Sequence, residues 1–113
     1  MNDCLFCRIA EKNIPADVVY EDEHVLAFRD IHPQAPLHVL IIPRKHIARV
    51  ENARADEREL LGRLVLAAKQ IAEEQGLKSG YRLVFNNGPD AGQEVEHIHL
   101  HLMGGRRFHW PAG

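Results

Sequence analysis

The chain has 113 residues, of which 45% are hydrophobic and 27% are charged, and its formal net charge is −2. This length and composition suit one compact domain that spans residues 1–113. Because charges of both signs are interspersed and nearly balanced, the composition excludes a polybasic protein that binds nucleic acid or anionic lipid through its overall charge.

The first nine residues lack a charged segment followed by a long apolar core, so they do not resemble a signal peptide. The longest apolar run in the chain is far too short to span a bilayer. We therefore expect a soluble cytoplasmic protein with neither a membrane partner nor a nucleic-acid partner.

Residues 3–12 are expected to form a short helix that ends before Pro15 and carries both cysteines, Cys4 and Cys7. In a reducing compartment, a Cys-x-x-Cys pair indicates half of a metal site or a redox dithiol before it indicates a disulfide. The choice between these two depends on which other ligands lie nearby.

Five segments have the composition of β-strands, because they are rich in β-branched and aromatic residues or form nearly continuous apolar runs. In chain order they are residues 17–20, 24–29, 37–42, 81–85 and 96–103. The acidic residues 21–23 separate the first two strands and predict a hairpin. Pro43 stops the third strand.

Residues 56–75 are predicted to form a long amphipathic helix between the third and fourth strands. Apolar residues recur with helical period on one face, and they are Leu61, Leu64, Val65, Ala68, Ile71 and Ala72. Asp56 and Glu59 have the spacing of a capping box, and Gly76 is a C-terminal stop signal. This element order predicts an α+β domain, with a five-stranded antiparallel sheet, one long helix and a short N-terminal helix.

Three histidines alternate with apolar residues in the fifth predicted strand, as His97-Ile98-His99-Leu100-His101-Leu102. Because side chains alternate across a strand, the histidines should share one face while the apolar residues point toward a core. Such a row can be a metal cluster or a set of ordinary polar residues. It can also hold a nucleophilic imidazole whose neighbours fix its tautomer.

This segment resembles the signature of the histidine-triad (HIT) family, with Met103 completing the final apolar position. The resemblance extends to residues 28–38 and 42–46, so it covers nearly the whole chain. The tail, residues 104–111, is similar to that of the Hint branch, the purine nucleoside phosphoramidases. A HIT-like fold is therefore implied.

The resemblance also implies a role for individual residues. The middle histidine, His99, would attack the α-phosphorus and become transiently nucleotidylated, while His101 and His38 would contact phosphate or organise protons. Asp30 matches the residue that holds the ribose hydroxyls. The apolar base slot matches Leu5, Phe6, Phe28, Ile31 and Leu40, and the phosphate and leaving-group positions match Asn86, Gly92, Gln93, Glu94 and Val95.

Each companion residue also has a purely structural interpretation. The five apolar residues are more often core than ligand slot on composition alone, and Asp30 and Gly92 can be ordinary turn residues. Glu94 departs from the family pattern, since many members carry a serine there. That substitution leaves the preferred leaving group open.

The resemblance gives the cysteine pair two partners. In a zinc-bearing subset of HIT proteins a Cys-Cys-His-His site ties the N-terminal segment to the sheet, and here its ligands would be Cys4, Cys7, His46 and His97. Zinc would then be structural, with all four positions closed, and no catalytic metal is expected. The alternative is that the cysteines are free thiols and His46 is a surface residue.

The activity that the resemblance implies is hydrolysis of purine nucleoside phosphoramidates to a nucleoside monophosphate through a covalent nucleotidyl-histidine. A homodimer is expected, with Trp110 reaching toward the partner's pocket. The alternatives are hydrolysis of dinucleoside polyphosphates, a nucleotide-binding regulatory module with little turnover, and a metal-dependent hydrolase that uses the three histidines as ligands.

Overall fold

The computed structural model describes residues 3–113, and residues 1 and 2 lie outside the described part of the chain. Its strands are β1 (Val18–Glu21), β2 (Val25–Arg29), β3 (Leu37–Pro43), β4 (Tyr81–Phe85) and β5 (Leu100–Gly104). Its α-helices are α1 (Leu5–Ala10) and α2 (Arg58–Glu74), and short 3-10 helices lie at Val50–Asn52, Ala55–Glu57 and Pro89–Ala91.

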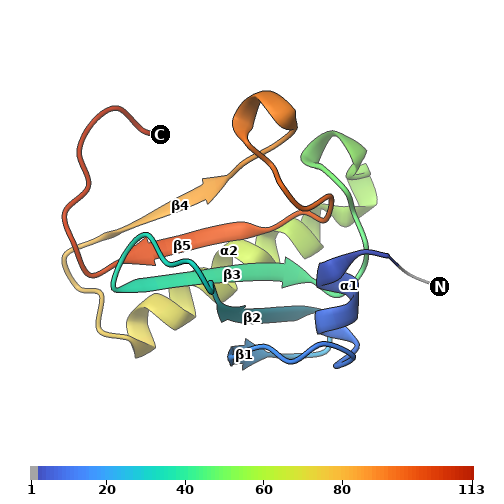
Figure 1. Cartoon of the computed structure of the whole chain (residues 1–113), viewed down its shortest axis with the longest axis horizontal. Coiled ribbons are helices and arrows are strands. Elements are labelled where there is room, and N and C mark those ends of the chain that lie inside the picture. Colours follow the sequence, from blue (N-terminus) through green and yellow to red (C-terminus); the bar gives the residue numbers. More distant parts are fainter. Residues whose placement is uncertain (1–2) are drawn as a thin grey trace.

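All neighbouring strands are antiparallel, and they form one sheet in the order β1-β2-β3-β5-β4 (Figure 1). The predicted α+β fold is therefore confirmed, and so is the hairpin of the first two strands. Among the described residues, no helix has the length and apolar character needed to cross a bilayer.

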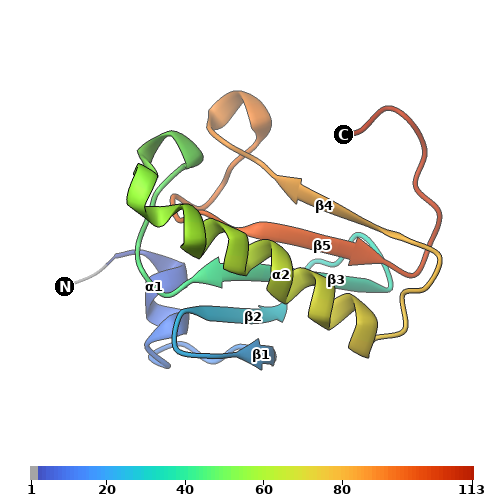
Figure 2. The ribbon, with the colours of Figure 1, turned by 180° about the vertical axis from the view of Figure 1, so that it is seen from behind.

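The sheet is covered on both faces, which explains why every residue of β3 is buried. The long helix α2 crosses one face (Figure 2), and the short helix α1 packs against the other (Figure 1). The core under α2 contains Val25, Ala27, Leu37, Val39, Ile41, Leu64, Ala67, Ala68, Ile71, Ala72, Leu100 and Leu102. The core under α1 contains Phe6, Ile9, Ala10, Leu26, Phe28, Leu40 and Ile42.

The buried face of α2 differs from the prediction at two positions. Val65 is 42% exposed, whereas Ala67 lies in the core. Four of the other predicted residues are buried, and Leu61 packs against the edge of the same core. The prediction for Val65 was wrong because each residue turns the helix by about 100°, which places Val65 and Ala67 at opposite edges of the apolar face. A small rotation of the helix therefore exposes Val65 and buries Ala67.

The start of α2 also differs from the prediction, whereas its end agrees. The capping box expected from Asp56 and Glu59 is wrong, because Glu57 precedes the helix and its carboxylate accepts a 2.7 Å hydrogen bond from the Arg54 N–H. At the other end Gly76 adopts the left-handed conformation at φ 73°. Its N–H donates to the Glu73 carbonyl, and the next N–H, that of Leu77, donates to Ala72, which is a Schellman motif.

The fifth strand is shorter at its start than the sequence predicts. It was expected over residues 96–103, but β5 begins at Leu100 and residues 96–99 lie outside the ladder. There the backbone hydrogen-bonds elsewhere, since the Ile98 N–H donates to the Ile47 carbonyl at 2.7 Å. Ile98 and Leu100 are nevertheless both buried, so the apolar side chains still point inward.

Candidate functional site

Three histidines gather on the face of the sheet that α1 covers. His38 lies in β3, His101 lies in β5, and His99 immediately precedes β5. The Nε2 atom of His38 is 2.9 Å from Nδ1 of His101, and the rings of His99 and His101 have centroids 5.0 Å apart. The structure therefore brings together the three residues for which the family resemblance implies catalytic roles.

Backbone partners define which nitrogen of each ring carries its proton. The Gln34 N–H donates to His38 Nδ1 at 3.0 Å, so the proton of neutral His38 lies on Nε2 and faces His101 Nδ1. His101 must then carry its own proton on Nε2. His99 donates from Nδ1 to the His97 carbonyl at 2.8 Å, which leaves the His99 Nε2 lone pair unprotonated.

The electrostatics of the site keep these rings neutral. Burial lowers the pKa of His101 to about 4, and the neighbouring His99 and His38 add to this effect. Burial also lowers the pKa of His99 and of His38, with the nearby Asp30 carboxylate opposing part of each shift. Because only a neutral imidazole has a lone pair, the environment favours a nucleophile over a cation.

Asp30 follows β2 and faces the histidines. Its Oδ1 accepts a 2.8 Å hydrogen bond from the His32 N–H, which is the turn role that the sequence allowed. Its Oδ2 is 3.4 Å from His38 Nε2, and its side chain is only 19% exposed. The carboxylate thus shapes the turn with one oxygen and faces the histidine cluster with the other.

The five predicted base-slot residues fall into two groups. Phe6, Phe28 and Leu40 are buried in the core under α1, and the Phe6 ring meets His99 edge-on at 5.0 Å. Leu5 and Ile31 are exposed, Ile31 at 86%. An apolar side chain this exposed beside Asp30 is available to contact a ligand, whereas the buried three shape the floor beneath the histidines.

The loop after β4 holds the remaining predicted residues, and Gln93 fastens it. The Gln93 side chain accepts from the Gly88 N–H and donates to the carbonyls of Ala48 and Val95, at 2.8–2.9 Å. Its amide is therefore used within the protein, and only its backbone remains for a ligand. Gly92 has φ 82°, a conformation that accounts for glycine there.

Glu94 and Val95 border a shallow cavity of about 410 Å³ between the loop and α1. Its lining residues are Asp3, Cys4, Leu5, His46, Glu94, Val95 and Glu96. Five predicted site residues therefore line one cavity: Leu5, Glu94 and Val95 from the predicted nucleotide site, and Cys4 and His46 from the predicted metal site. Asn86 lies at the other end of the loop, directly after β4, and is half-buried.

A second cluster joins α1 to the loops at the other end of the sheet. Its ligand atoms are Cys4 Sγ, Cys7 Sγ, His46 Nδ1 and His97 Nδ1, which all lie within 4.8 Å of one another. The separations are 3.2 Å for Cys4–His97, 3.3 Å for Cys7–His46, 3.5 Å for Cys7–His97 and 3.3 Å for His46–His97.

These residues fit a tetrahedral zinc ion. Bond lengths of about 2.3 Å to sulfur and 2.05 Å to nitrogen give ligand separations of about 3.4–3.8 Å, close to those observed. His97 is fully buried, its Nε2 donates to the Pro43 carbonyl at 2.8 Å, and its Nδ1 lone pair therefore faces the cluster. Burial lowers the pKa of His97 to about 4, which keeps it neutral as a ligand must be.

The clusters show how the triad histidines are divided. Among the described residues, His97 groups with the cysteines, whereas His101 groups with Asp30 and His38. No metal-ligand group there contains all three triad histidines. This division argues against the metal-dependent hydrolase that uses the three histidines as one ligand set.

Sequence reasoning missed the backbone groups that orient the rings. The Gln34 N–H and the His97 carbonyl each select a tautomer, but every residue type except proline carries these groups, so no side-chain pattern signals them. Phe6 was expected only in the base slot, yet its ring contacts both His97 and His99. Only the packing of α1 reveals that contact.

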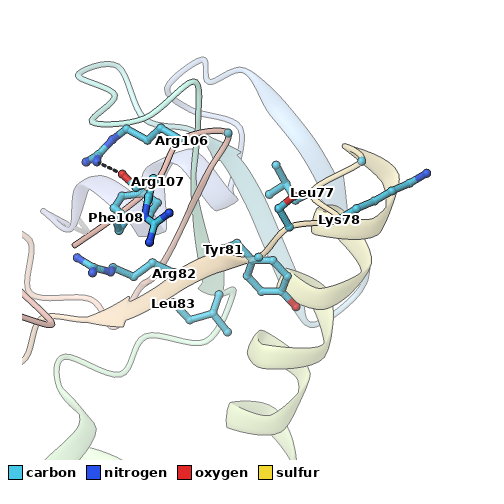
Figure 3. A pocket seen from close by; sticks show the side chains of 12 residues that line it. Leu77, Lys78, Tyr81, Arg82, Leu83, Arg106, Arg107 and Phe108 are labelled. Carbon is cyan, nitrogen blue, oxygen red and sulfur yellow. Dashed lines mark hydrogen bonds between the residues drawn. The ribbon is translucent and has the colours of Figure 1, made fainter. Parts of the chain in front are cut away.

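The larger of the two cavities described lies away from the histidines. This groove of about 950 Å³ follows the free edge of β4. Figure 3 shows Arg82, Arg106 and Phe108 on one side of it and Lys78 on the other. The guanidiniums of Arg82 and Arg106 lie over the Phe108 ring, at 4.8 Å and 4.0 Å from its centroid. The Arg82 contact attaches the C-terminal tail to β4.

Comparisons with known proteins agree with this geometry. The HIT domain family model matches residues 11–108. An uncharacterized HIT-like protein of Synechococcus elongatus is 52% identical over 111 residues, covering 98% of this chain and 97% of that protein. The 14 kDa zinc-binding protein of Zea mays is 54% identical over 111 residues, covering 96% and 87%.

Solved structures show the same fold. A HIT family hydrolase from Legionella pneumophila has a TM-score of 0.96 and 57% identity, with coverage of 98% of this chain and 100% of that one. A HIT family hydrolase from Clostridium thermocellum has a TM-score of 0.94 and 43% identity, with coverage of 98% and 97%.

Proposed function

This chain belongs to the histidine-triad (HIT) family, and from that membership we propose that it hydrolyses purine nucleoside phosphoramidates to a nucleoside monophosphate, with residues 1–113 forming one HIT domain. The observation that carries the proposal is the orientation of His99. Its Nδ1–H donates to the His97 carbonyl at 2.8 Å, so its Nε2 lone pair is available for attack on phosphorus. The relatives named as HIT family hydrolases support a hydrolase.

The reaction proceeds by two displacements. In the first, His99 Nε2 forms a bond to the α-phosphorus, the phosphorus–nitrogen bond breaks, and the leaving amine takes the proton from His101 Nε2. In the second, water forms the new phosphorus–oxygen bond, His99 is released, and a proton returns to His101. Between the two steps, the positive charge of nucleotidylated His99 balances the negative charge that His101 gains when it gives up its proton.

The remaining residues bind and orient the nucleotide. Asp30 presents Oδ2 beside the histidines, where it can accept hydrogen bonds from ribose hydroxyls. Backbone N–H groups of residues 92–95 lie on the loop that Gln93 fastens, and such groups stabilise charge on a phosphate. Leu5 and Ile31 would contact the base above the floor formed by Phe6, Phe28 and Leu40.

We propose a structural zinc at Cys4, Cys7, His46 and His97, consistent with the name of the maize zinc-binding relative. Zinc bound there would cross-link α1, the segment after β3 and the segment before β5, and four protein ligands leave no open position for water. Thiolate ligands persist where thiols stay reduced, so we also propose that the protein works in the cytoplasm.

We further propose a homodimer formed through β4 and α2. β4 is an edge strand, and its Tyr81, Leu83 and Phe85 are partly exposed on the face that α2 covers. α2 adds the exposed Val65 and Leu66. Exposed edges and apolar patches favour pairing with another chain, and Trp110, which is 88% exposed, would then reach the partner's site.

The dimer is tested by analytical ultracentrifugation of Leu83→Glu and of the control Val50→Glu, which adds the same charge at another exposed apolar position. The wild type and the control should sediment as dimers, and Leu83→Glu as a monomer. A monomeric wild type would refute the proposed dimer but would leave the proposed hydrolysis untested.

The activity is tested by mass spectrometry after brief mixing of an adenosine phosphoramidate with the wild type and with His99→Ala. We expect a nucleotidyl adduct on the wild type, release of AMP, and neither with the variant. Equal AMP release by both proteins would refute the covalent mechanism. Binding of AMP without turnover of phosphoramidates or dinucleoside polyphosphates would show a regulatory nucleotide-binding module instead.

A further inference from the structure

We propose that the Cys4–Cys7–His46–His97 cluster positions the nucleophile, because His97 belongs both to the cluster and to the hydrogen bond that holds the His99 ring. A metal bound there would fix the His97 backbone, and the His97 carbonyl would then select the attacking tautomer of His99. This inference rests on the proposed function, since it takes His99 as the nucleophile.

The sheet does not hold this part of the chain. The ladder pairs of β5 with β3 and β4 begin at Leu100, so His97 and His99 lie before the strand. Contacts outside the cluster hold the segment in place of a ladder. The His97 ring donates to the Pro43 carbonyl, the Ile98 N–H donates to the Ile47 carbonyl, and Arg49 donates two hydrogen bonds to the Glu96 carboxylate at the surface.

The cluster fixes both sides of the second contact. His46 and His97, whose Nδ1 atoms are 3.3 Å apart, directly precede Ile47 and Ile98, the two residues that share the backbone hydrogen bond. A shared metal ion would therefore clamp the 46–47 segment to the 97–98 segment.

The His97 carbonyl is the group through which this clamp acts on chemistry. It accepts the His99 Nδ1–H at 2.8 Å. A neutral imidazole has two tautomers, and loss of this acceptor would allow the proton to occupy Nε2, where it blocks the attacking lone pair. Because the carbonyl orientation depends on the backbone at residue 97, displacement of the His97 ring is expected to change the His99 tautomer.

Phe6 provides a second connection. It lies between the two cysteines in α1, and its ring meets His97 at 6.0 Å and His99 at 5.0 Å, edge-on in both cases. Six residues are too few for a helix to be stable alone, so the position of α1 depends on its packing and its cysteine anchors. A metal that holds Cys4 and Cys7 would therefore also press Phe6 against the nucleophile.

The test compares the zinc-loaded protein, the metal-free protein and Cys7→Ala at one pH. The first readout is the ring ¹⁵N spectrum of His99, assigned by its absence in His99→Gln, which distinguishes the two neutral tautomers. The second is kcat and KM for an adenosine phosphoramidate. We expect the loaded protein to show only the Nδ1–H tautomer.

Loss of the metal should mix the His99 tautomers and lower kcat by about 10–100-fold, the usual effect of losing an orienting group next to a site. KM should change less, because Asp30 and Ile31, which would bind the ribose and the base, lie outside both α1 and the cluster. Added zinc should restore the metal-free wild type but not Cys7→Ala. A kcat within twofold of the loaded value, with an unchanged His99 spectrum, would overturn the proposal.

Leu64→Ala is the matched control, because it weakens the core on the opposite face of the sheet. Measured where it is fully folded, it should keep the His99 tautomer and kcat, whereas a general loss of stability would change both. If the metal-free protein unfolds, cadmium-loaded and zinc-loaded proteins are compared instead. The larger ion should shift the His99 signals and lower kcat, and identical spectra and rates would overturn the proposal.

This experiment separates the two proposals. If the zinc-loaded wild type forms no nucleotidyl adduct and releases no AMP, the proposed function fails. The ¹⁵N spectrum still reports then whether the cluster controls the His99 ring. If the adduct forms at the same rate with and without metal, the function stands and the positioning role fails.

Discussion

The Gln34 N–H donates a 3.0 Å hydrogen bond to Nδ1 of His38, and this bond sets the direction of the whole histidine chain. It places the His38 proton on Nε2, 2.9 Å from Nδ1 of His101. His101 is therefore left with a proton on the nitrogen that does not face His38. In the proposed reaction, a main-chain amide three residues before β3 would thus prepare the proton donor for the leaving group.

The first prediction follows from that donor. His101→Ala should lower kcat by about 100-fold or more for an alkylamine leaving group, which must be protonated to depart. The loss should be much smaller for a p-nitrophenolate leaving group, which needs no proton. Steady-state kinetics with both substrates check this, and an equal loss with both would exclude His101 as the acid.

The second prediction concerns stability against pH. Burial lowers the pKa of His101 from 6.5 to about 4, so between these values the unfolded chain binds more protons than the folded one. The free energy of unfolding should therefore fall as the pH drops from about 6.5 to about 4. Each such histidine contributes up to about 1.4 kcal/mol per pH unit.

Urea denaturation of the zinc-loaded protein at several pH values measures this slope. His101→Gln should show a shallower slope than the wild type over the same range, while acid release of metal affects both proteins alike. Identical slopes would mean that His101 titrates normally in the folded protein.

The third prediction concerns the metal. Elemental analysis should find one zinc per chain, and Cys7→Ser should abolish it, because three remaining ligands bind zinc far less tightly. His109→Ala is the control, since His109 is exposed and lies outside the cluster. Chelation should lower the melting temperature of the wild type. Undiminished zinc in Cys7→Ser would place the ion elsewhere.

The fourth prediction separates the two oxygens of Asp30. Asp30→Asn can keep the turn, because an amide oxygen still accepts the His32 N–H, but it loses the charged acceptor beside the histidines. Affinity for a ribonucleotide should fall about 10–100-fold, as for a lost hydrogen bond to a charged group. Calorimetric titration with AMP and with 2′,3′-dideoxy-AMP checks this, and the dideoxy ligand should lose little.

The fifth prediction uses two glycines as a pair. A Cβ on Gly104 would lie 2.5 Å from Leu77 Cδ1, so Gly104→Ala should destabilise the fold by about 1–3 kcal/mol. Gly62 lies in α2 with no atom within 4 Å of its Cβ position, so Gly62→Ala should stabilise by about 1 kcal/mol. Thermal denaturation measures both, and equal effects would contradict the crowding at Gly104.

The sequence predicted the sheet and both α-helices, because periodicity and spacing report which side chains share a face. The meeting of His38 with His99 and His101 was implied only by the family resemblance. Sequence reasoning missed the start of β5, since residues 96–99 have strand-like composition but bond to the 46–47 segment. It also placed Val65 in the core, where Ala67 lies. Long-range contacts decide such details, and local patterns do not contain them.

The metal ligands illustrate the same limit. Cys-x-x-Cys indicated half of a site, but only the family resemblance named His46 and His97, which are 39 and 90 residues from Cys7 in the sequence. The roles of the base-slot and loop residues stay predictions. The structure adds the orienting groups, such as the Gln34 N–H, which no residue type encodes.

The side chain of Gln93 braces the loop after β4 with three hydrogen bonds. A loop braced in this way already has its shape before a nucleotide arrives, so little chain entropy is lost on binding. In the proposed reaction the same holds for the product, since a nucleoside monophosphate carries the same phosphate. Release of the product, rather than bond cleavage, would then be the rate-limiting step with the best substrates.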